Sequence, residues 1–455
     1  MCALVAALWL AAAPAVAEDA SDELVQMVLG LIGDQDKDLR AIGLEQVRTA
    51  AKGAAATKQF VALLPTLSPD AQVGLLSALA DRGDSTATAS VRELLATSKA
   101  EPVRVAAIQA LGVLGDTADV GSLVKLLGAQ AAAEKAAARA SLIRLKGETT
   151  PQQIAVAIGA AEPLVRVALV EILATRRAID TLPTILELTT GDDASVRAAA
   201  MATAAQLAAP HQADGMLPGV LKAEPGKERE AAERCVATVC GRAENPEAAV
   251  LIAMEHLDER SYLALLPMLG RVGGPTAYQV IQTVVAKSDP MAHEIGVRAL
   301  ANWPKATIAP RLIELVKSEK NPKCRSMALA ALVRVAPLPD KRSDDERLAL
   351  LQQALSLCQT DEERQAVVKR VRAIRTIEAL RFLVPYLADP THAQLASESV
   401  VELAHHRGLR EPNKAEFDKA LDKVMATSKD PVVVDRAQRY KNGQTWVRPK
   451  AEATQ

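Results

Sequence analysis

A motif of about 31 residues recurs along almost the whole chain, and it constrains the fold more than any other feature. The clearest copy runs from Glu101 to Gly115 as Glu-Pro-Val-Arg-Val-Ala-Ala-Ile-Gln-Ala-Leu-Gly-Val-Leu-Gly. Its arginine, or the residue in that place, recurs every 31 or 32 residues until a last interval of 39, at Arg40, Gln72, Arg104, Lys135, Arg166, Arg197, Arg229, Ser261, His293, Arg325 and Arg364. A fixed period in this range predicts a solenoid of stacked helix pairs.

Each repeat reads as two helices. The second begins at a capping residue and continues with apolar residues at helical spacing, as after Asp193. The same signal of a cap followed by proline recurs at Glu162-Pro163, Asp289-Pro290, Asn321-Pro322 and Asp430-Pro431. The first helix carries a leucine-rich stripe such as Val91–Leu95. We therefore predict an all-α fold, an α-α superhelix of roughly thirteen helix pairs, and find no pattern typical of strands.

The consensus Asp/Glu-x-x-Val-Arg-x-x-Ala-x-x-Ala-Leu-Gly-x-Leu-Gly resembles the HEAT repeat, in the short bacterial form called the PBS-lyase-like HEAT repeat. The resemblance is strongest at 101–127, 162–188, 193–207 and 321–335. It implies that the helix bearing Val-Arg lines the concave face of the superhelix. It also implies a scaffold or adaptor role, because most such proteins are scaffolds or adaptors. A minority are lyases or chaperones that act on a protein-bound chromophore.

The N-terminal segment has the pattern of a secretory signal peptide. Residues 3–13 are apolar, and Ala15-Val16-Ala17 matches an A-x-A cleavage site. We predict a signal peptide over 1–17, cleaved after Ala17, and an exported protein in the periplasm or outside the cell. The mature chain then holds a HEAT-repeat solenoid over 18–441 and a polar tail over 442–455. The alternative is that the apolar segment forms a first solenoid helix, because no Lys or Arg precedes it.

Four cysteines would remain after cleavage, namely Cys235, Cys240, Cys324 and Cys358. Export would place them where disulfides are permitted. Cys235 and Cys240 point in different directions around one predicted helix, so they should not pair. Cys324 and Cys358 lie in neighbouring repeats, which leaves two possibilities: a disulfide between these two, or four small buried hydrophobic residues.

Composition and motifs weigh against several classes of function. The formal net charge is -1 and aromatic residues are 2% of the chain, so we expect no nucleic-acid partner. No phosphate-binding loop, nucleophile elbow, zinc-protease motif or Cys-x-x-Cys occurs. The one His-Glu pair, His293-Glu294, is too little for a di-iron site. We predict no catalytic residues, no metal, no cofactor, no enzyme activity and no transmembrane segment in the mature chain.

The recurring arginines have a structural interpretation. Each lies near an acidic residue at a helix start, which predicts a ladder of arginine–carboxylate pairs between neighbouring repeats. The column five residues later should face the concave side. It has mixed chemistry and no continuous charge, and consists of Gln109, Glu171, Ala202, Arg234, Arg298, Ala330 and Lys369.

One repeat is unusually basic, with Arg364, Arg370 and Arg381 among its cations. Longer linkers flank it at 337–345 and 405–413. Together with residues of the adjacent repeats it supplies our candidate partner-binding residues: Arg334, Lys369, Arg370, Arg372, Arg375, His405 and His406. A protein with an acidic segment, a phosphate or another polyanion could bind there. The alternative is a solvated helix face balanced by nearby acids.

These observations favour a non-catalytic scaffold or adaptor that binds a protein partner, of unknown identity, on the concave face. Two alternatives remain. One is a lyase or chaperone acting on a chromophore or modified protein, and the other is a polyanion-binding module that uses the C-terminal basic residues.

Overall fold

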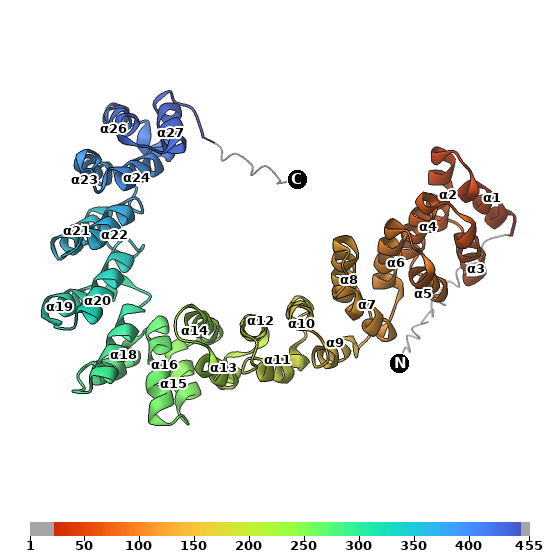
Figure 1. Ribbon diagram of the computed structural model, residues 1–455, viewed down its shortest axis with the longest axis horizontal. Helices are drawn as coiled ribbons and strands as arrows, with labels where there is room; N and C mark the ends of the chain where they lie inside the picture. Colours follow the sequence, from red (N-terminus) through yellow and green to blue (C-terminus); the bar gives the residue numbers. More distant parts are fainter. Residues whose placement is uncertain (1–21, 447–455) are drawn as a thin grey trace, which may run out of the picture. The chain divides into compact units, whose positions relative to one another are not determined.

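The chain folds into helices that follow one another in pairs (Figure 1). The computed structural model describes residues 22–446, and within this range the secondary structure is helical, without strands. Of the 27 α-helices among the described residues, the short α25 lies in a linker, and the other 26 form thirteen successive pairs. The all-α class and the solenoid of about thirteen pairs are therefore confirmed. The predicted signal peptide over 1–17 and most of the predicted tail lie outside the described residues.

The described chain divides into two units, one of residues 22–208 with 222–228 and one of residues 209–221 with 229–446. The first unit contains α1 (Asp22–Gly33), α2 (Lys37–Thr49), α3 (Ala54–Leu63), α4 (Pro69–Arg82), α5 (Thr88–Thr97), α6 (Glu101–Leu114), α7 (Val120–Leu127), α8 (Ala132–Arg144), α9 (Thr150–Ile158), α10 (Pro163–Thr175), α11 (Leu182–Leu188) and α12 (Ala194–Leu207). The division falls within α13 (Leu217–Lys222) and α14 (Lys227–Cys240).

The second unit contains the remaining helices. They are α15 (Pro246–Met254), α16 (Glu259–Val272), α17 (Pro275–Val285), α18 (Pro290–Ala301), α19 (Ala309–Ser318), α20 (Pro322–Val335), α21 (Asp344–Ser356), α22 (Asp361–Val371), α23 (Ile377–Leu383), α24 (Ala393–His405), α25 (Arg407–Arg410), α26 (Lys414–Thr427) and α27 (Pro431–Lys441). The linker before α21 and the one holding α25 are the two long linkers that the sequence indicates.

The predicted caps are present at the starts of the second helices. The side chains of Asp193, Asp289, Asn321 and Asp430 each accept a hydrogen bond from a backbone N–H in the first turn. Glu162 occupies the same position before α10 but makes no such bond. We attribute the difference to its extra methylene, since the shorter aspartate and asparagine are the preferred caps.

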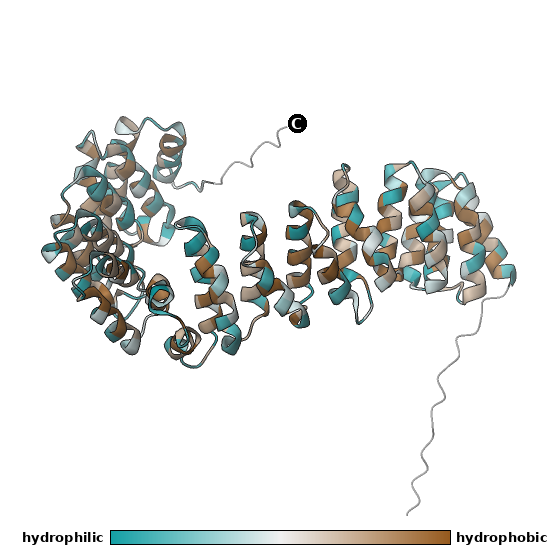
Figure 2. Cartoon of the chain, turned by 60° about the horizontal axis from the view of Figure 1, so that its bottom comes forward, coloured by the Kyte–Doolittle hydropathy of each residue, from teal (hydrophilic) through white to brown (hydrophobic). Residues whose placement is uncertain are grey.

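The second helices pack against one another from repeat to repeat. In the first unit α4 contacts α2 and α6, and α10 contacts α8 and α12; in the second, α18 contacts α16 and α20, and α22 contacts α20 and α24. Apolar and polar residues alternate around the helices (Figure 2). Second helices are buried over a broad face because they contact both their own first helix and the neighbouring second helices.

The first helices bury a narrower stripe. In α7, Val120, Leu123 and Leu127 are buried, and in α5 the buried apolar residues are Val91 and Leu95. This spacing places one apolar face toward the second helix of the pair. None of the helices within 22–446 is both long enough and apolar enough to cross a membrane.

The four described cysteines are free thiols. Cys240 and Cys324 are buried, as expected of small hydrophobic residues, whereas Cys235 and Cys358 are partly exposed. Burial raises the pKa of the Cys240 thiol to about 11. The structure therefore has no bond between Cys324 and Cys358, and the interpretation as small buried hydrophobic residues holds for Cys240 and Cys324.

Two helical glycines allow adjacent second helices to approach closely. A Cβ on Gly270 of α16 would lie 2.0 Å from the carbonyl oxygen of Ala299 in α18. A Cβ on Gly112 of α6 would lie 2.7 Å from the Cα of Ser141 in α8. Both contacts involve backbone, so the neighbouring helix itself would have to move.

We predict that Gly270→Ala lowers the free energy of unfolding by about 1–3 kcal/mol, because overpacking outweighs the gain in helix propensity. Gly30→Ala in α1 is the matched control, since nothing lies within 4 Å of its added Cβ. It should raise stability by about 0.5–1 kcal/mol. Chemical denaturation measures both, and a stabilised Gly270→Ala variant would contradict the close approach.

Candidate partner-binding surface

Four of the motif arginines form ion pairs with acidic residues one repeat further along. Arg40 Nη2 lies 3.3 Å from Asp70 Oδ2, and Arg197 Nη2 lies 2.8 Å from Glu228 Oε1. Arg104 pairs with Glu134 through two nitrogens, the longer contact being 3.0 Å. Arg325 Nη1 lies 3.0 Å from Glu363 Oε1. The predicted arginine ladder is confirmed at these four junctions.

Motif arginines also bind backbone carbonyls within their own repeat, and Arg166 does so without a carboxylate partner among residues 22–446. Arg104 donates to the oxygen of Leu95 at 2.7 Å, near the end of the first helix. Arg197 donates to Gly191 and Arg166 to Gly159 in the corresponding linkers. Each guanidinium thus satisfies carbonyls that a helix end leaves unpaired. Arg364 differs, because it pairs with Asp361 in its own helix.

A second set of arginines stabilises the junctions at the other end of the second helices. Arg176 donates to Leu142, Ile143 and Leu145, whose carbonyls end α8 and lie one repeat earlier. Arg82 does the same for α2. Sequence analysis missed these residues. In the sequence, such an arginine is recognisable only as a basic residue near the end of a second helix. Its partner carbonyls belong to the preceding repeat and come close only when the helices stack.

The residues named above that lie five positions after the motif arginine are all exposed, and we call them the exposed row. They are Gln109, Glu171, Ala202, Arg234, Arg298, Ala330 and Lys369. Its side chains come from second helices and project away from the packed faces. The helix geometry therefore leaves one aligned set of side chains in each unit available to a partner.

Two of the predicted partner-binding residues serve the fold. Arg334 of α20 donates to the carbonyls of Ala301 and Trp303 at 2.9 and 2.6 Å, which end α18. Arg370 of α22 donates to the carbonyl of Arg334 at 3.0 Å. Although part of each side chain is exposed, burial of the guanidinium lowers the pKa of both. They belong to the second arginine set, so we leave them out of the binding surface.

The two histidines are likewise engaged with their surroundings. His405 ends α24 and its Nδ1 lies 2.9 Å from the hydroxyl of Tyr440. His406 stacks edge-on against His405. Burial lowers the pKa of His406, and the nearby Arg375 and His405 lower it further.

Three cations of the basic repeat remain available. Lys369, Arg372 and Arg375 have no ion-pair or hydrogen-bond partner among residues 22–446. Arg372 lies near enough to Arg370 to lower its pKa, and Arg375 does the same to His406. Arg372 and Arg375 thus lie near other basic groups, and together with Lys369 we call them the basic triad.

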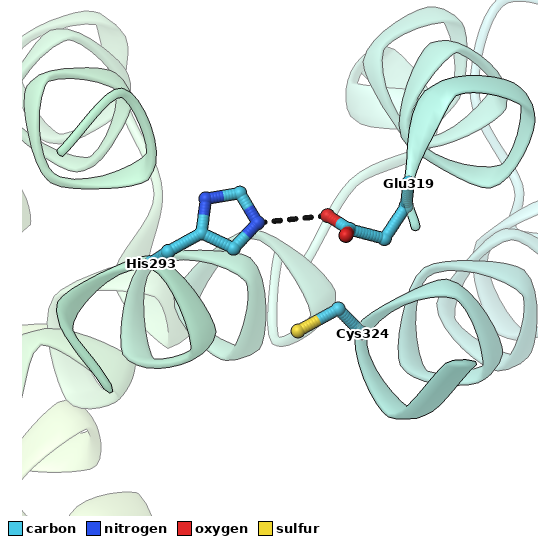
Figure 3. Close-up of side chains that lie close together, drawn as sticks. All are labelled: His293, Glu319 and Cys324. Atoms are coloured by element: carbon cyan, nitrogen blue, oxygen red, sulfur yellow. Dashed lines mark hydrogen bonds and ion pairs between the residues drawn. The ribbon is translucent and has the colours of Figure 1, made fainter. Parts of the chain in front are cut away.

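One repeat replaces the ladder arginine by histidine, and Figure 3 shows the result. The Nε2 of His293 in α18 faces Glu319 Oε2 at 2.7 Å, and its Nδ1 lies 2.7 Å from the carbonyl oxygen of Val285. His293 thus takes both roles of a ladder arginine, one toward a carbonyl and one toward a carboxylate. The side chain of Cys324 in α20 points toward the same space.

A mainly apolar groove lies on the first-helix side of the second unit. It has a volume of about 900 Å³ and lies between α19 and α21, where Pro310, Ile313 and Leu350 are among the residues that line it. The groove offers a second surface for contacts, distinct from the exposed row on the second helices.

Neither a family model nor a curated protein matches this sequence. Solved structures similar to it include Kap121p bound to the SUMO protease Ulp1p, which aligns over 92% of this chain and 56% of its own, with 11% identity and a TM-score of 0.46. Importin beta aligns over 92% and 68%, with 11% identity and a TM-score of 0.37. This chain thus spans just over half the length of the Kap121p chain. At such scores we draw no function from these proteins.

The ladder pair Arg104–Glu134 allows a prediction about pH. The hydrogen bond from Arg104 lowers the pKa of the buried Glu134 carboxyl despite its burial. Because the folded-state pKa is depressed, the pair stabilises the fold above the ordinary glutamate pKa of about 4.3, and the stabilisation is lost as the pH falls through the folded-state value.

We therefore expect Glu134→Gln to lower the free energy of unfolding by about 1–2 kcal/mol near neutral pH. The difference from wild type should shrink in acid. Asp435→Asn removes an exposed pair with Arg439 and should cost less than about 1 kcal/mol. Urea denaturation across the pH range tests this, and a pH-independent loss in Glu134→Gln would contradict it.

Proposed function

We propose that this chain is a non-catalytic scaffold that binds a protein partner along the concave face formed by its second helices. The observation that carries the proposal is the exposed row, in which seven repeats present one side chain each at the same helix position. A solenoid that presents equivalent positions from successive repeats suits an extended partner surface.

The division of labour among the charged residues supports the proposal. The ladder arginines make contacts between repeats and are not available to a partner. The same holds for Arg82, Arg176, Arg334 and Arg370. The exposed row retains Gln109, Glu171 and Lys369 among its members, so both charges and neutral polar groups are presented. A protein surface of mixed charge complements such a row better than a uniform polyanion does.

The finer assignments also belong to this proposal. The Val-Arg motif supports a PBS-lyase-like HEAT-repeat protein, and residues 3–17 support export with cleavage after Ala17. Mass spectrometry of the protein from its native host would test the latter. A mature chain that begins at Glu18 is expected, whereas an uncleaved N-terminus would contradict it.

Two substitutions should prevent a partner from binding to the exposed row while leaving every native ion pair and hydrogen bond of a charged side chain in place. Ala202→Arg and Ala330→Arg place long cations on the second helices, where arginine is tolerated. Ala62→Arg on α3 and Ala349→Arg on α21 are exposed counterparts on first helices, the latter in the apolar groove. We predict that a partner co-purifying under mild extraction is lost from the row variants and retained by the first-helix variants.

All four variants should keep the wild-type melting temperature, which separates blocked binding from misfolding. Loss of the partner from Ala349→Arg alone would place binding in the apolar groove and contradict the proposal. A wild-type chain that runs as a partner-free monomer under several mild extraction conditions would also contradict it.

The basic triad supports a second candidate function, which is binding of a polyanion or an acidic segment. Three cations without a carboxylate partner on one repeat can donate charge-assisted hydrogen bonds to an anion. The triad comprises Lys369, Arg372 and Arg375, with Lys369 shared with the exposed row. This function uses a local site on one repeat, in contrast to the extended surface of the scaffold.

We predict that the variant with Lys369, Arg372 and Arg375 replaced by alanine elutes from a heparin column at clearly lower salt than wild type. The control replaces the exposed Lys317, Lys320 and Lys429 by alanine and loses the same charge. It should elute near the wild-type position. Equal elution of the two triple variants would show a general charge effect and remove the polyanion site.

A further inference from the structure

Two departures from the repeat occur in consecutive repeats. His293 stands where the motif has arginine, as in Arg104 and Arg197. In the next repeat, Cys324 stands where the motif has valine, directly before the motif arginine; the corresponding residues elsewhere include Val103, Val165 and Val196. Neither histidine nor cysteine is needed for packing at these positions, because arginine and valine fill them in other repeats.

The two departures meet at one point in the fold, together with Glu319 from the linker between α19 and α20 (Figure 3). The His293 nitrogen, the Glu319 carboxylate oxygen and the Cys324 sulfur all lie within 4.8 Å of one another. Cys324 is buried, and His293 and Glu319 are partly exposed. An imidazole, a carboxylate and a thiol thus converge on a space that borders the solvent.

A neutral His293 ring cannot satisfy both of the acceptors that face it, so a positive charge is needed between the ring and Glu319. Both ring nitrogens face acceptors, the Val285 carbonyl at Nδ1 and the carboxylate at Nε2. A neutral ring can donate from only one nitrogen. An arginine would bring its own charge, whereas His293 needs either a second proton or a metal ion at Nε2.

Hydrogen bonds on the far side of two of the ligand groups leave the atoms that face the site for a metal. The bond to the Val285 carbonyl fixes the proton on Nδ1, which leaves the Nε2 lone pair for a metal, as backbone carbonyls do for metal-binding histidines. Glu319 Oε1 accepts a hydrogen bond from the Asn321 backbone N–H at 2.8 Å, which leaves Oε2 on the side that faces His293. Cys324 lies in the first turn of α20, on a rigid helix.

We propose that His293 Nε2, the Glu319 carboxylate and Cys324 Sγ bind a zinc-class divalent cation, with a water molecule in the fourth position. The thiol–imidazole–carboxylate set suits zinc, whereas magnesium and calcium prefer ligands that are all oxygen. On binding, the thiol proton leaves to solvent and the sulfur–metal bond replaces the S–H bond. This site goes beyond the scaffold function and joins α18 to α20 across a repeat junction.

The His293–Glu319 pair needs only a small change to hold a metal ion. Nitrogen and oxygen ligands about 2.0–2.1 Å from a tetrahedral zinc ion lie about 3.3 Å apart. The present separation of Nε2 and Oε2 is 2.7 Å. A rotation of the partly exposed Glu319 side chain supplies the difference for this pair, and the Cys324 sulfur already lies within 4.8 Å of both atoms.

The test uses the full-length chain, stripped of metal with a chelator and titrated with Co²⁺ and then Zn²⁺. Wild type should bind one Co²⁺ and develop the near-ultraviolet charge-transfer band of a cobalt–thiolate bond. Competition with Zn²⁺ should abolish the band, and Zn²⁺ should raise the melting temperature. No stoichiometric binding by wild type, or binding without the thiolate band, would overturn the proposal.

The variants restore the residues of the repeat motif and are therefore expected to fold. Cys324→Val removes the sulfur, and His293→Arg keeps the contacts to Val285 and Glu319 while removing the ligand nitrogen. Both should lose the band and bind Zn²⁺ about 100-fold more weakly or worse. Cys240→Val removes another buried cysteine of the second unit and should behave as wild type. A band that persists in Cys324→Val would also overturn the site.

Discussion

At several repeats of this chain, guanidinium groups bind the carbonyl groups that end the helices, either in their own repeat or in the preceding one. Arg104 reaches the end of its own first helix and the Glu134 carboxylate of the next repeat. Arg176 reaches back to the carbonyls that end α8. Because one side chain serves two elements, stacking and helix termination are coupled. The rest of the structure, including the close glycine contacts, depends on this register.

The period, the helix pairs and the ladder could be predicted from sequence because they are local or recur at a fixed interval. Asp193 and Asp289 mark helix starts by their own chemistry, and the arginine column repeats. The second arginine set could not be predicted, since Arg334 and Arg370 look like surface cations until stacking brings the carbonyls of the preceding helix to them. Glu319 was missed because its position has no counterpart in the motif.

The structure separates charged residues that maintain the solenoid from those that remain for a partner. Arg334 and Arg370 belong to the first group, whereas Lys369, Arg372 and Arg375 belong to the second, although all five are close in sequence or space. The same comparison singles out His293 and Cys324. His293 still makes the junction contacts of a ladder arginine, but it and Cys324 bring ligand atoms that the motif residues lack, and there we place specific chemistry.

The central claim is that the arginine ladder couples neighbouring repeats, and a double-mutant cycle on Arg197 and Glu228 tests it most directly. Both side chains are largely buried, and their charged atoms are 2.8 Å apart. Unfolding free energies of Arg197→Met, Glu228→Gln and the double variant should give a coupling energy of about 1–3 kcal/mol. A coupling energy near zero, with additive losses, would contradict the account.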